Sequence, residues 1–104
     1  MEELRRGGGA TRFEGYAYGS SVSFFVTNAP EGRGPDLHRH PYEETFVITD
    51  GSAVFTVEGE TIEATAGTII VVPAGAPHKF RTGRNGMRSV NIHGSDRMRQ
   101  EDLE

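Results

Sequence analysis

Apolar residues in this chain recur in short alternating runs, and no window keeps a helical period for long. After the glycine at position 51, the residues Ala53, Phe55 and Val57 share one face of a strand, as expected where one side is buried. Gly59 then predicts a tight hairpin, because glycine readily takes the positive φ that a two-residue turn needs. The same reasoning along the sequence predicts short strands at residues 11–18, 21–27, 36–40, 44–49, 52–58, 60–64, 68–72, 78–81 and 87–93.

Glycine and proline separate these expected strands. The chain has 14 Gly and 5 Pro, and the segments between them are rich in Val, Ile, Phe, Tyr and Thr. Many short strands joined by regular turns are typical of an all-β sandwich or closed barrel. A length of 104 residues fits one domain with a single modest core, so we expect residues 1–104 to form one unit. We expect the acidic residues 100–104 to be a frayed tail or a short turn against the outside of the barrel.

Composition narrows the function classes. The absence of cysteine excludes a disulfide framework, a thiolate metal ligand and a cysteine nucleophile. The formal charge is −4 and the basic residues are scattered, so we expect no nucleic-acid partner. The first residues contain no apolar run, and nowhere do 18 apolar residues occur together. Neither export nor membrane insertion is therefore signalled, and we expect a cytoplasmic protein.

A cluster of metal-ligand residue types begins within the expected strand at 36–40. His38 and His40 are two residues apart, so both side chains point to the same face of a strand. Pro41 lets the chain turn, after which Glu44 can return to the same interior from the start of the next strand. His78 stands just past a Pro/Gly turn and supplies a further imidazole. Imidazole and carboxylate are ligands for divalent transition metals, so these four residues predict a metal site.

Two segments of the sequence resemble the paired motifs of the cupin superfamily. The first motif spans 32–51 and the second 67–82, and the spacing of every matching residue is kept; the matches are Gly32, His38, His40, Glu44, Gly51, Gly67, Pro73, Gly75 and His78. Thr82 is the one departure, because the family usually has Asn there. The resemblance implies a double-stranded β-helix, or jelly-roll barrel, of the small single-domain type. It also implies that His38, His40, Glu44 and His78 hold a divalent metal (Fe, Mn, Ni, Cu or Zn).

An open metal site suggests several functions. Three neutral imidazoles and one carboxylate in an octahedral arrangement leave two positions for a substrate or dioxygen. We therefore expect a small metal-dependent enzyme acting on a small organic molecule, with dioxygenase-type oxidation favoured. One alternative is a non-enzymatic cupin that binds or senses a small ligand. Another is a metal-assisted cyclase or isomerase, which would need a proton-transfer residue such as Tyr42 or Glu43 at the pocket.

Other residues receive less specific expectations. Tyr42 lies two residues from both His40 and Glu44, so it could share their strand face and is a candidate acid or base. We nevertheless expect its side chain to be exposed. His93 fits neither motif and is expected at the surface or at a strand end. The arginines Arg81, Arg84 and Arg88 are expected to be scattered surface charge, and the phenylalanines Phe24, Phe46, Phe55 and Phe80 to be core residues. We expect a homodimer, because the amino-terminal strand at 11–18 could pair across an interface and cover apolar edges.

Overall fold

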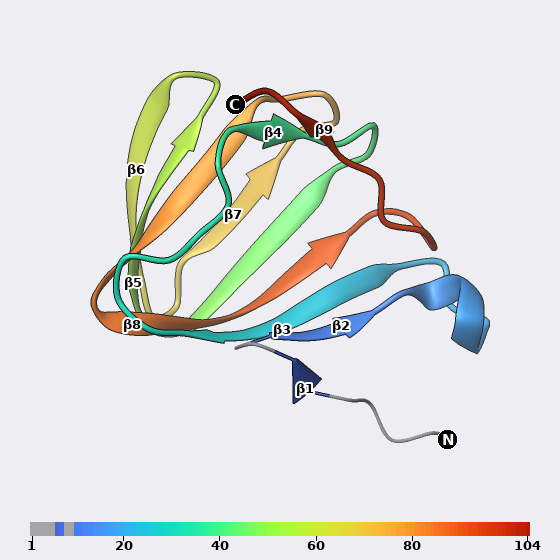
Figure 1. The fold of residues 1–104 in the computed structure, drawn as a ribbon, viewed down its shortest axis with the longest axis horizontal. Helices are drawn as coiled ribbons and strands as arrows, with labels where there is room; N and C mark the ends of the chain where they lie inside the picture. Colours follow the sequence, from blue (N-terminus) through green and yellow to red (C-terminus); the bar gives the residue numbers. More distant parts are fainter. Residues whose placement is uncertain (1–5, 8–9) are drawn as a thin grey trace.

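The computed structural model describes residues 6–7 and 10–104. Apart from one short 3-10 helix, η1 (Gly15–Tyr18), the regular structure of this part of the chain consists of strands (Figure 1). The strands are β1 (Arg6–Gly7), β2 (Ala10–Phe13), β3 (Ser23–Ala29), β4 (His38–Arg39), β5 (Glu44–Val57), β6 (Glu60–Thr65), β7 (Ile69–Val72), β8 (His78–His93) and β9 (Glu101–Asp102). The sheet curls on itself as in a jelly-roll barrel, which confirms the expected all-β fold.

Two long strands connect the layers of the barrel. The first residues of β5 pair with β7 and with the end of β8, whereas its last residues pair with β6 and with the start of β8. The register shifts near Gly51, where φ is 74° and an added Cβ would lie 2.1 Å from the carbonyl oxygen of Gly86. Separate strands at 44–49 and 52–58, and at 78–81 and 87–93, were expected. Each pair is instead one bent strand, because a glycine-bearing irregularity lets the backbone bend without ending the ladder.

The hairpin between β5 and β6 has the expected turn. Glu58 and Gly59 have φ angles of 50° and 81°, as a two-residue turn with positive φ at both central positions requires. The expected strand at 11–18 is wrong in its second half. β2 ends at Phe13, and η1 follows because the backbone N–H of Ser20 donates to the carbonyl of Gly15 and closes a compact turn.

The core lies between the two layers. Phe46, Phe55 and Phe80 contact one another, with ring centroids 4.9 to 5.8 Å apart, and all three are buried as predicted. Phe24 is a correction, because it lies on the outward side of β3 and stacks on Phe13 at 4.5 Å. Among the residues whose burial the structure describes, the buried apolar side chains are Phe46, Ile48, Ala53, Phe55, Ala64, Ile70, Val72, Ala76, Phe80 and Met87.

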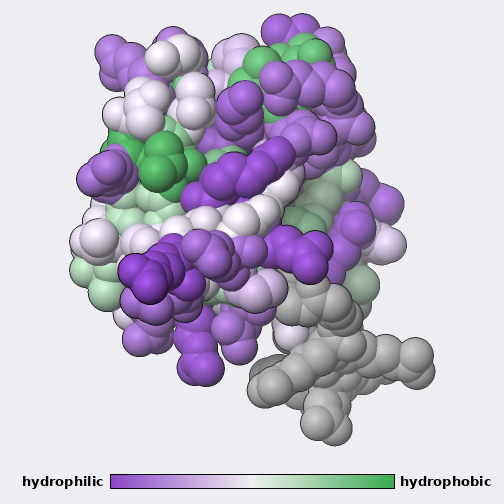
Figure 2. Space-filling model, turned by 60° about the vertical axis from the view of Figure 1, so that its left-hand side comes forward, coloured by the Kyte–Doolittle hydropathy of each residue, from purple (hydrophilic) through white to green (hydrophobic). Residues whose placement is uncertain are grey.

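The outward side of the layer containing β3, β7 and the end of β8 is unusually apolar. Across neighbouring strands, Val26 pairs with Val90, Val90 with Val47, and Val47 with Ile69. Val26, Ile69 and Val71 are 47 to 64% exposed. A sheet face in contact with water normally alternates to polar residues on that side. By contrast, the face drawn in Figure 2 is mainly hydrophilic, with apolar atoms showing only in small groups.

The carboxyl-terminal segment differs most from expectation. Residues 100–104 were expected to be a frayed tail or a turn, but β9 pairs with β4, placing Asp102 opposite His38 and Glu101 opposite Arg39. A bidentate ion pair between Arg39 and Glu101, with distances of 2.9 and 3.1 Å, ties the two strands together. This order arises because β4 would otherwise present an unpaired backbone edge. Within the described residues, no helix has the length and apolar character needed to cross a membrane.

Candidate metal centre

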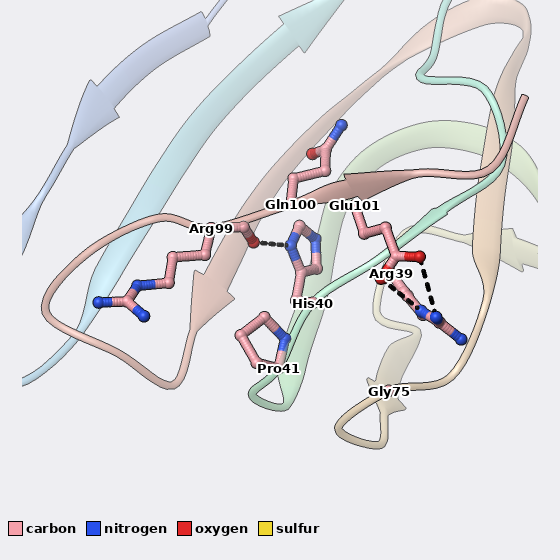
Figure 3. A pocket seen from close by; sticks show the side chains of 7 residues that line it. All are labelled: Arg39, His40, Pro41, Gly75, Arg99, Gln100 and Glu101. Atoms are coloured by element: carbon pink, nitrogen blue, oxygen red, sulfur yellow. Dashed lines mark hydrogen bonds and ion pairs between the residues drawn. The ribbon is translucent and has the colours of Figure 1, made fainter.

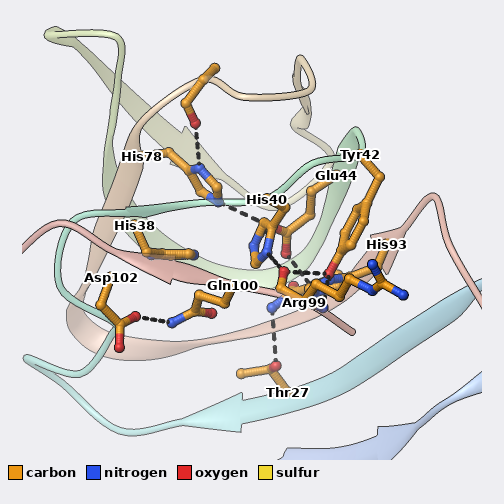
Figure 4. A network of polar contacts seen from close by, with 12 residues as sticks. Thr27, His38, His40, Tyr42, Glu44, His78, His93, Arg99, Gln100 and Asp102 are labelled. Carbon is orange, nitrogen blue, oxygen red and sulfur yellow. Dashed lines mark hydrogen bonds and ion pairs between the residues drawn. The ribbon is translucent and has the colours of Figure 1, made fainter. Parts of the chain in front are cut away.

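Three side chains that are close in the sequence meet a fourth, which lies 34 residues beyond Glu44, inside the barrel. One ligand-type atom from each of His38, His40, Glu44 and His78 lies within 4.8 Å of the others, and all four residues are buried (Figure 4). His38 and His78 are direct cross-strand partners of β4 and β8, which places their rings 4.2 Å apart. Glu44 opens β5, and the exposed Glu43 points away from the cluster as expected. The strand alternation predicted from the sequence therefore brings these four residues together.

Backbone carbonyls fix the protonation of the three imidazoles. The Nδ1 atoms of His38, His40 and His78 lie 2.7, 2.6 and 2.9 Å from the carbonyl oxygens of Asp36, Arg99 and Ala76, respectively. A carbonyl oxygen can only accept a hydrogen bond, so each Nδ1 carries the proton. In the neutral ring the lone pair is then on Nε2.

Two of these lone pairs, on His40 and His78, face the carboxylate of Glu44. Its Oε1 lies 3.1 Å from Nε2 of His40 and 3.0 Å from Nε2 of His78. The Nε2 atom of His40 is buried and lacks a well-aligned hydrogen-bond partner among the described residues, despite this short distance. Two acceptors facing each other in a buried space repel unless a cation or a proton lies between them. The donor set therefore fits a divalent cation coordinated by nitrogen and oxygen.

The electrostatics agree with a buried anion among imidazoles. Burial disfavours the ionised form of Glu44, but its contacts with His40, His78 and His93 outweigh burial and hold the pKa of this carboxyl well below its usual range. Burial lowers the pKa of His38, which keeps that ring neutral. Burial also opposes the charged form of His40, but Glu44 and the Arg99 carbonyl overcome it and raise the pKa of His40. A proton would therefore compete with any metal ion for the Nε2 atom of His40.

His93 and Tyr42 require corrections. His93 does end its strand, but it is only 3% exposed, not at the surface, and its Nε2 lies 3.2 Å from Oε2 of Glu44. Its Nδ1 lies 2.6 Å from the hydroxyl of Tyr42, which is half-buried where exposure was expected. The reason is register, because Glu44 and His93 are direct cross-strand partners. The alternation of side chains along the strand could have predicted this burial, because His93 lies on the same strand face as the buried Met87.

The chain can now be compared with known proteins. Residues 24–89 match the family model described as Cupin domain, which covers more than half of the sequence. The chain belongs to the cupin family. The expectation drawn from the two motifs is thus confirmed for family and fold.

Known relatives resemble this cupin over different lengths. An uncharacterized protein of Streptomyces coelicolor is 39% identical over 60 residues, which are 58% of this chain and 55% of the relative. The chain thus spans about half the length of this curated relative. The DMSP lyase DddQ from Ruegeria pomeroyi is 27% identical with a TM-score of 0.71, covering 80% of this cupin and 43% of the lyase. A Bacillus subtilis oxalate decarboxylase with Mn(II) centres has a TM-score of 0.76 at 19% identity, covering 98% of this chain and 30% of the decarboxylase.

His40 lines two cavities formed by the described residues. The larger, of about 350 Å³, opens between β4 and the carboxyl-terminal segment (Figure 3), and it is lined by Arg39, His40, Pro41, Gly75, Arg99, Gln100 and Glu101. The smaller, of about 150 Å³, lies on the His93 side and is lined by Arg12, Phe25, His40, Tyr42, His93, Met98, Arg99 and Gln100. The carboxyl-terminal segment that was expected to be frayed therefore forms a wall of both cavities.

Thr82 and Arg81 anchor the loop that leads to β4. Thr82, where the family usually has Asn, accepts the backbone N–H of Arg33 at 2.8 Å and donates to the carbonyl of Pro30. Arg81 donates to the carbonyls of Gly34 and Pro35 and pairs with Asp36. The departure from the family pattern thus keeps the loop anchored. All three of the expected surface arginines are exposed, namely Arg81, Arg84 and Arg88.

Proposed function

We propose that this cupin is a metal-dependent enzyme that acts on a small organic molecule. One observation carries the proposal: three imidazoles with protonated Nδ1 atoms and one oxygen of Glu44 face the same buried point. His38, His40, Glu44 and His78 would hold the metal, and residues 1–104 would act as a single domain. The cavities beside His40 give a small molecule access to that point.

The donor set favours a divalent transition metal. Nitrogen and oxygen ligands without thiolate suit Fe, Mn, Ni, Cu or Zn. The Mn(II) centres of the similar oxalate decarboxylase support manganese within this group. When bound, such a metal would supply Lewis acidity and, if redox-active, a place for dioxygen. The chain's own residues orient the ligands through backbone carbonyls, and the Glu44 carboxylate lowers the net charge of the site.

Oxygen-dependent oxidation of the substrate is the leading reaction class. His38, His40, Glu44 and His78 would hold the metal, and a bound redox-active ion would supply sites for a substrate oxygen and for dioxygen. Phe46 packs edge-on against His78, with ring centroids 6.2 Å apart, and belongs to the apolar core that keeps water away from one side of the site. The substrate would then enter from the cavity side.

The position of Tyr42 favours a second candidate, a cyclase or isomerase that uses no oxygen. Its hydroxyl is 2.6 Å from His93 and accepts the backbone N–H of Arg99 at 3.1 Å, and the side chain lines the smaller cavity. Burial raises the pKa of Tyr42, so the phenol stays protonated at neutral pH and can donate a proton to substrate. Glu43, the other residue considered for this role, is exposed. A cupin that only binds its ligand is the remaining alternative.

Metal analysis tests the proposal directly. Protein purified without added metal should contain a divalent transition metal, and His40→Ala and His78→Ala should each lose most of it, with affinity reduced by about tenfold or more. Lys79→Ala is the matched control, because Lys79 neighbours His78 but is partly exposed and paired with Glu104 at 3.6 Å. Full occupancy in both histidine variants would refute the assignment.

Glu44→Gln separates an enzyme from a binding module. The substitution keeps the shape and an oxygen ligand but removes the charge, so turnover should be abolished while ligand affinity changes by less than about tenfold. Catechol, enol and β-diketone compounds would be offered to the metal-loaded protein, with product and oxygen consumption followed. Altered product without oxygen uptake, lost in Tyr42→Phe, would favour the second candidate. Tight binding without any product would favour the alternative of a cupin that only binds its ligand.

A further inference from the structure

The smaller cavity beside His93 is bordered by two arginines. Arg12 lies on the inward side of β2, opposite Phe25 of β3, and Arg99 lies at the start of the carboxyl-terminal segment. Arg12 is partly neutralised, because it pairs with Glu14 at 2.8 Å. Arg99 has an exposed side chain that lines both cavities. Its guanidinium is therefore the more available of the two.

The backbone of Arg99 is held firmly even though its side chain is exposed. Its N–H donates to the Tyr42 hydroxyl at 3.1 Å, and its carbonyl accepts from Nδ1 of His40 at 2.6 Å. In Figure 3 the side chain extends away from His40 and Glu101, on the other side of the backbone carbonyl. The side chain of Arg99 is thus attached to a backbone that is fixed beside His40.

Buried nitrogen atoms in the same wall also indicate a ligand. Nε2 of His40 and Nε2 of His93 are buried and lack well-aligned hydrogen-bond partners among the described residues, and both histidines line the smaller cavity. Buried polar atoms are normally satisfied, so the Nε2 atom of His40 calls for a bound group. A metal held by His38, His40, Glu44 and His78 would satisfy it, whereas Nε2 of His93 faces Oε2 of Glu44 at 3.2 Å.

We propose that this cavity binds the carboxylate group of a small organic acid, with Arg99 as its main cationic partner and Arg12 as a second one. The inference rests on the proposed function and names the substrate class. A bound divalent cation would outweigh the single charge of Glu44, and the Arg99 guanidinium adds to this local excess of positive charge, whereas Arg12 is partly neutralised by Glu14. Guanidinium groups match the planar carboxylate with paired N–H donors.

Size restricts the acid to a few carbon atoms. The cavity volume of about 150 Å³ is below the ~300 Å³ at which pockets for drug-sized ligands begin. It corresponds to about five water molecules at the ~30 Å³ that each occupies in the liquid. A short hydroxy or keto acid fits this space, whose wall includes His40 of the candidate metal site.

Lactate and propane-1,2-diol are matched probes, because they share a three-carbon chain and a hydroxyl but differ in the carboxylate. Each would be titrated by NMR into the zinc-loaded chain of residues 1–104. We expect lactate to bind about tenfold or more tightly than the diol, and rising salt to weaken only lactate. Arg99→Gln should weaken lactate about three- to tenfold, and Arg99→Lys should retain part of the affinity.

Arg97→Gln is the control, because the Arg97 guanidinium stacks on Tyr16 at 3.9 Å and is not among the cavity residues. It should leave lactate affinity within about twofold. Zinc content is measured for every variant, so that failure of the metal site is recognised separately by loss of zinc. If zinc is retained but Arg99→Gln binds lactate as wild type does, or lactate binds no better than the diol, the inference is wrong.

Discussion

The carboxylate of Glu44 lies directly opposite His93, with Oε2 of Glu44 3.2 Å from Nε2 of His93. The other oxygen, Oε1, faces His40 and His78. The two oxygens of one carboxylate thus have different surroundings. Because Oε2 contacts His93, which in turn contacts the Tyr42 hydroxyl, only Oε1 of Glu44 faces His40 and His78.

Replacing His93 should weaken metal binding although His93 is outside the predicted ligand set. In His93→Phe the ring volume is kept but the contact with Oε2 is lost, so Glu44 can rotate and metal affinity should fall about 10- to 100-fold. His93→Gln, which keeps a donor, should lose less. Affinity would be measured by competition with a chelator, and far-UV circular dichroism would confirm folding. Unchanged affinity in a folded His93→Phe protein would contradict the role.

Acidification should release the metal. Imidazoles bind metal only when neutral, and the raised pKa of His40 means that a proton competes there earlier than at an ordinary histidine. We expect occupancy to decline as the pH falls below about 6. Occupancy would be followed by dialysis and metal analysis. Full retention at a pH of about 4.5 would argue against a histidine-rich site.

The metal-free protein should have a different pH optimum. The pKa of Glu44 is lowered, so its stabilising contribution is present above the unfolded value of about 4.3 and is lost as the pH falls through the folded pKa. The pKa of His40 is raised, so its contribution is present below about 6.5 and is lost as the pH rises through the folded pKa. Melting temperatures measured with chelator should therefore peak on the acidic side of neutrality. A metal-free protein that becomes steadily more stable above this range would oppose the assignment.

The strand pair β4 and β9 should slow metal release. Arg39→Glu or Glu101→Arg alone puts like charges opposite each other across this pair and should speed release about threefold, because an exposed ion pair is worth at most about 1 kcal/mol. Exchanging both residues restores opposite charges and should return the rate to within about twofold. Release into excess chelator gives the rates. A double variant as fast as the faster single variant would show that the ion pair is not responsible.

The homodimer remains a prediction, and the apolar outward face gives it a location. Ile69 and Val71 are 64% and 57% exposed at the edge strand β7, next to the valines of β5, β8 and β3. Light scattering should give a mass of about twice the 11.4 kDa of one chain. Ile69→Lys with Val71→Lys should yield monomers. Val54→Lys, at a 43% exposed position on the last part of β5, is the control. A wild-type monomer at micromolar concentration would exclude the dimer.

Strand periodicity was sufficient for the features that depend on near neighbours. The shared face of His38 and His40 and the turn at Gly59 follow from alternation and local backbone preferences. His93 was misjudged because its contact with Glu44 depends on the register between β5 and β8. The contact between His40 and Arg99 uses a backbone carbonyl, which leaves no signal in the identity of residue 99. The sequence pattern therefore could not predict contacts that depend on long-range strand pairing or on main-chain acceptors.

The backbone partner of His40 lies 59 residues further along the chain. During translation His40, Glu44 and His78 are all synthesised before Arg99. Until Arg99 arrives, its carbonyl cannot fix the proton on Nδ1 of His40, and β4 has no β9 beside it. Contacts between distant segments form only after the chain between them is available. A metal ion that meets the nascent protein would therefore find loosely arranged histidines. We expect stable metal binding only after β9 has been synthesised.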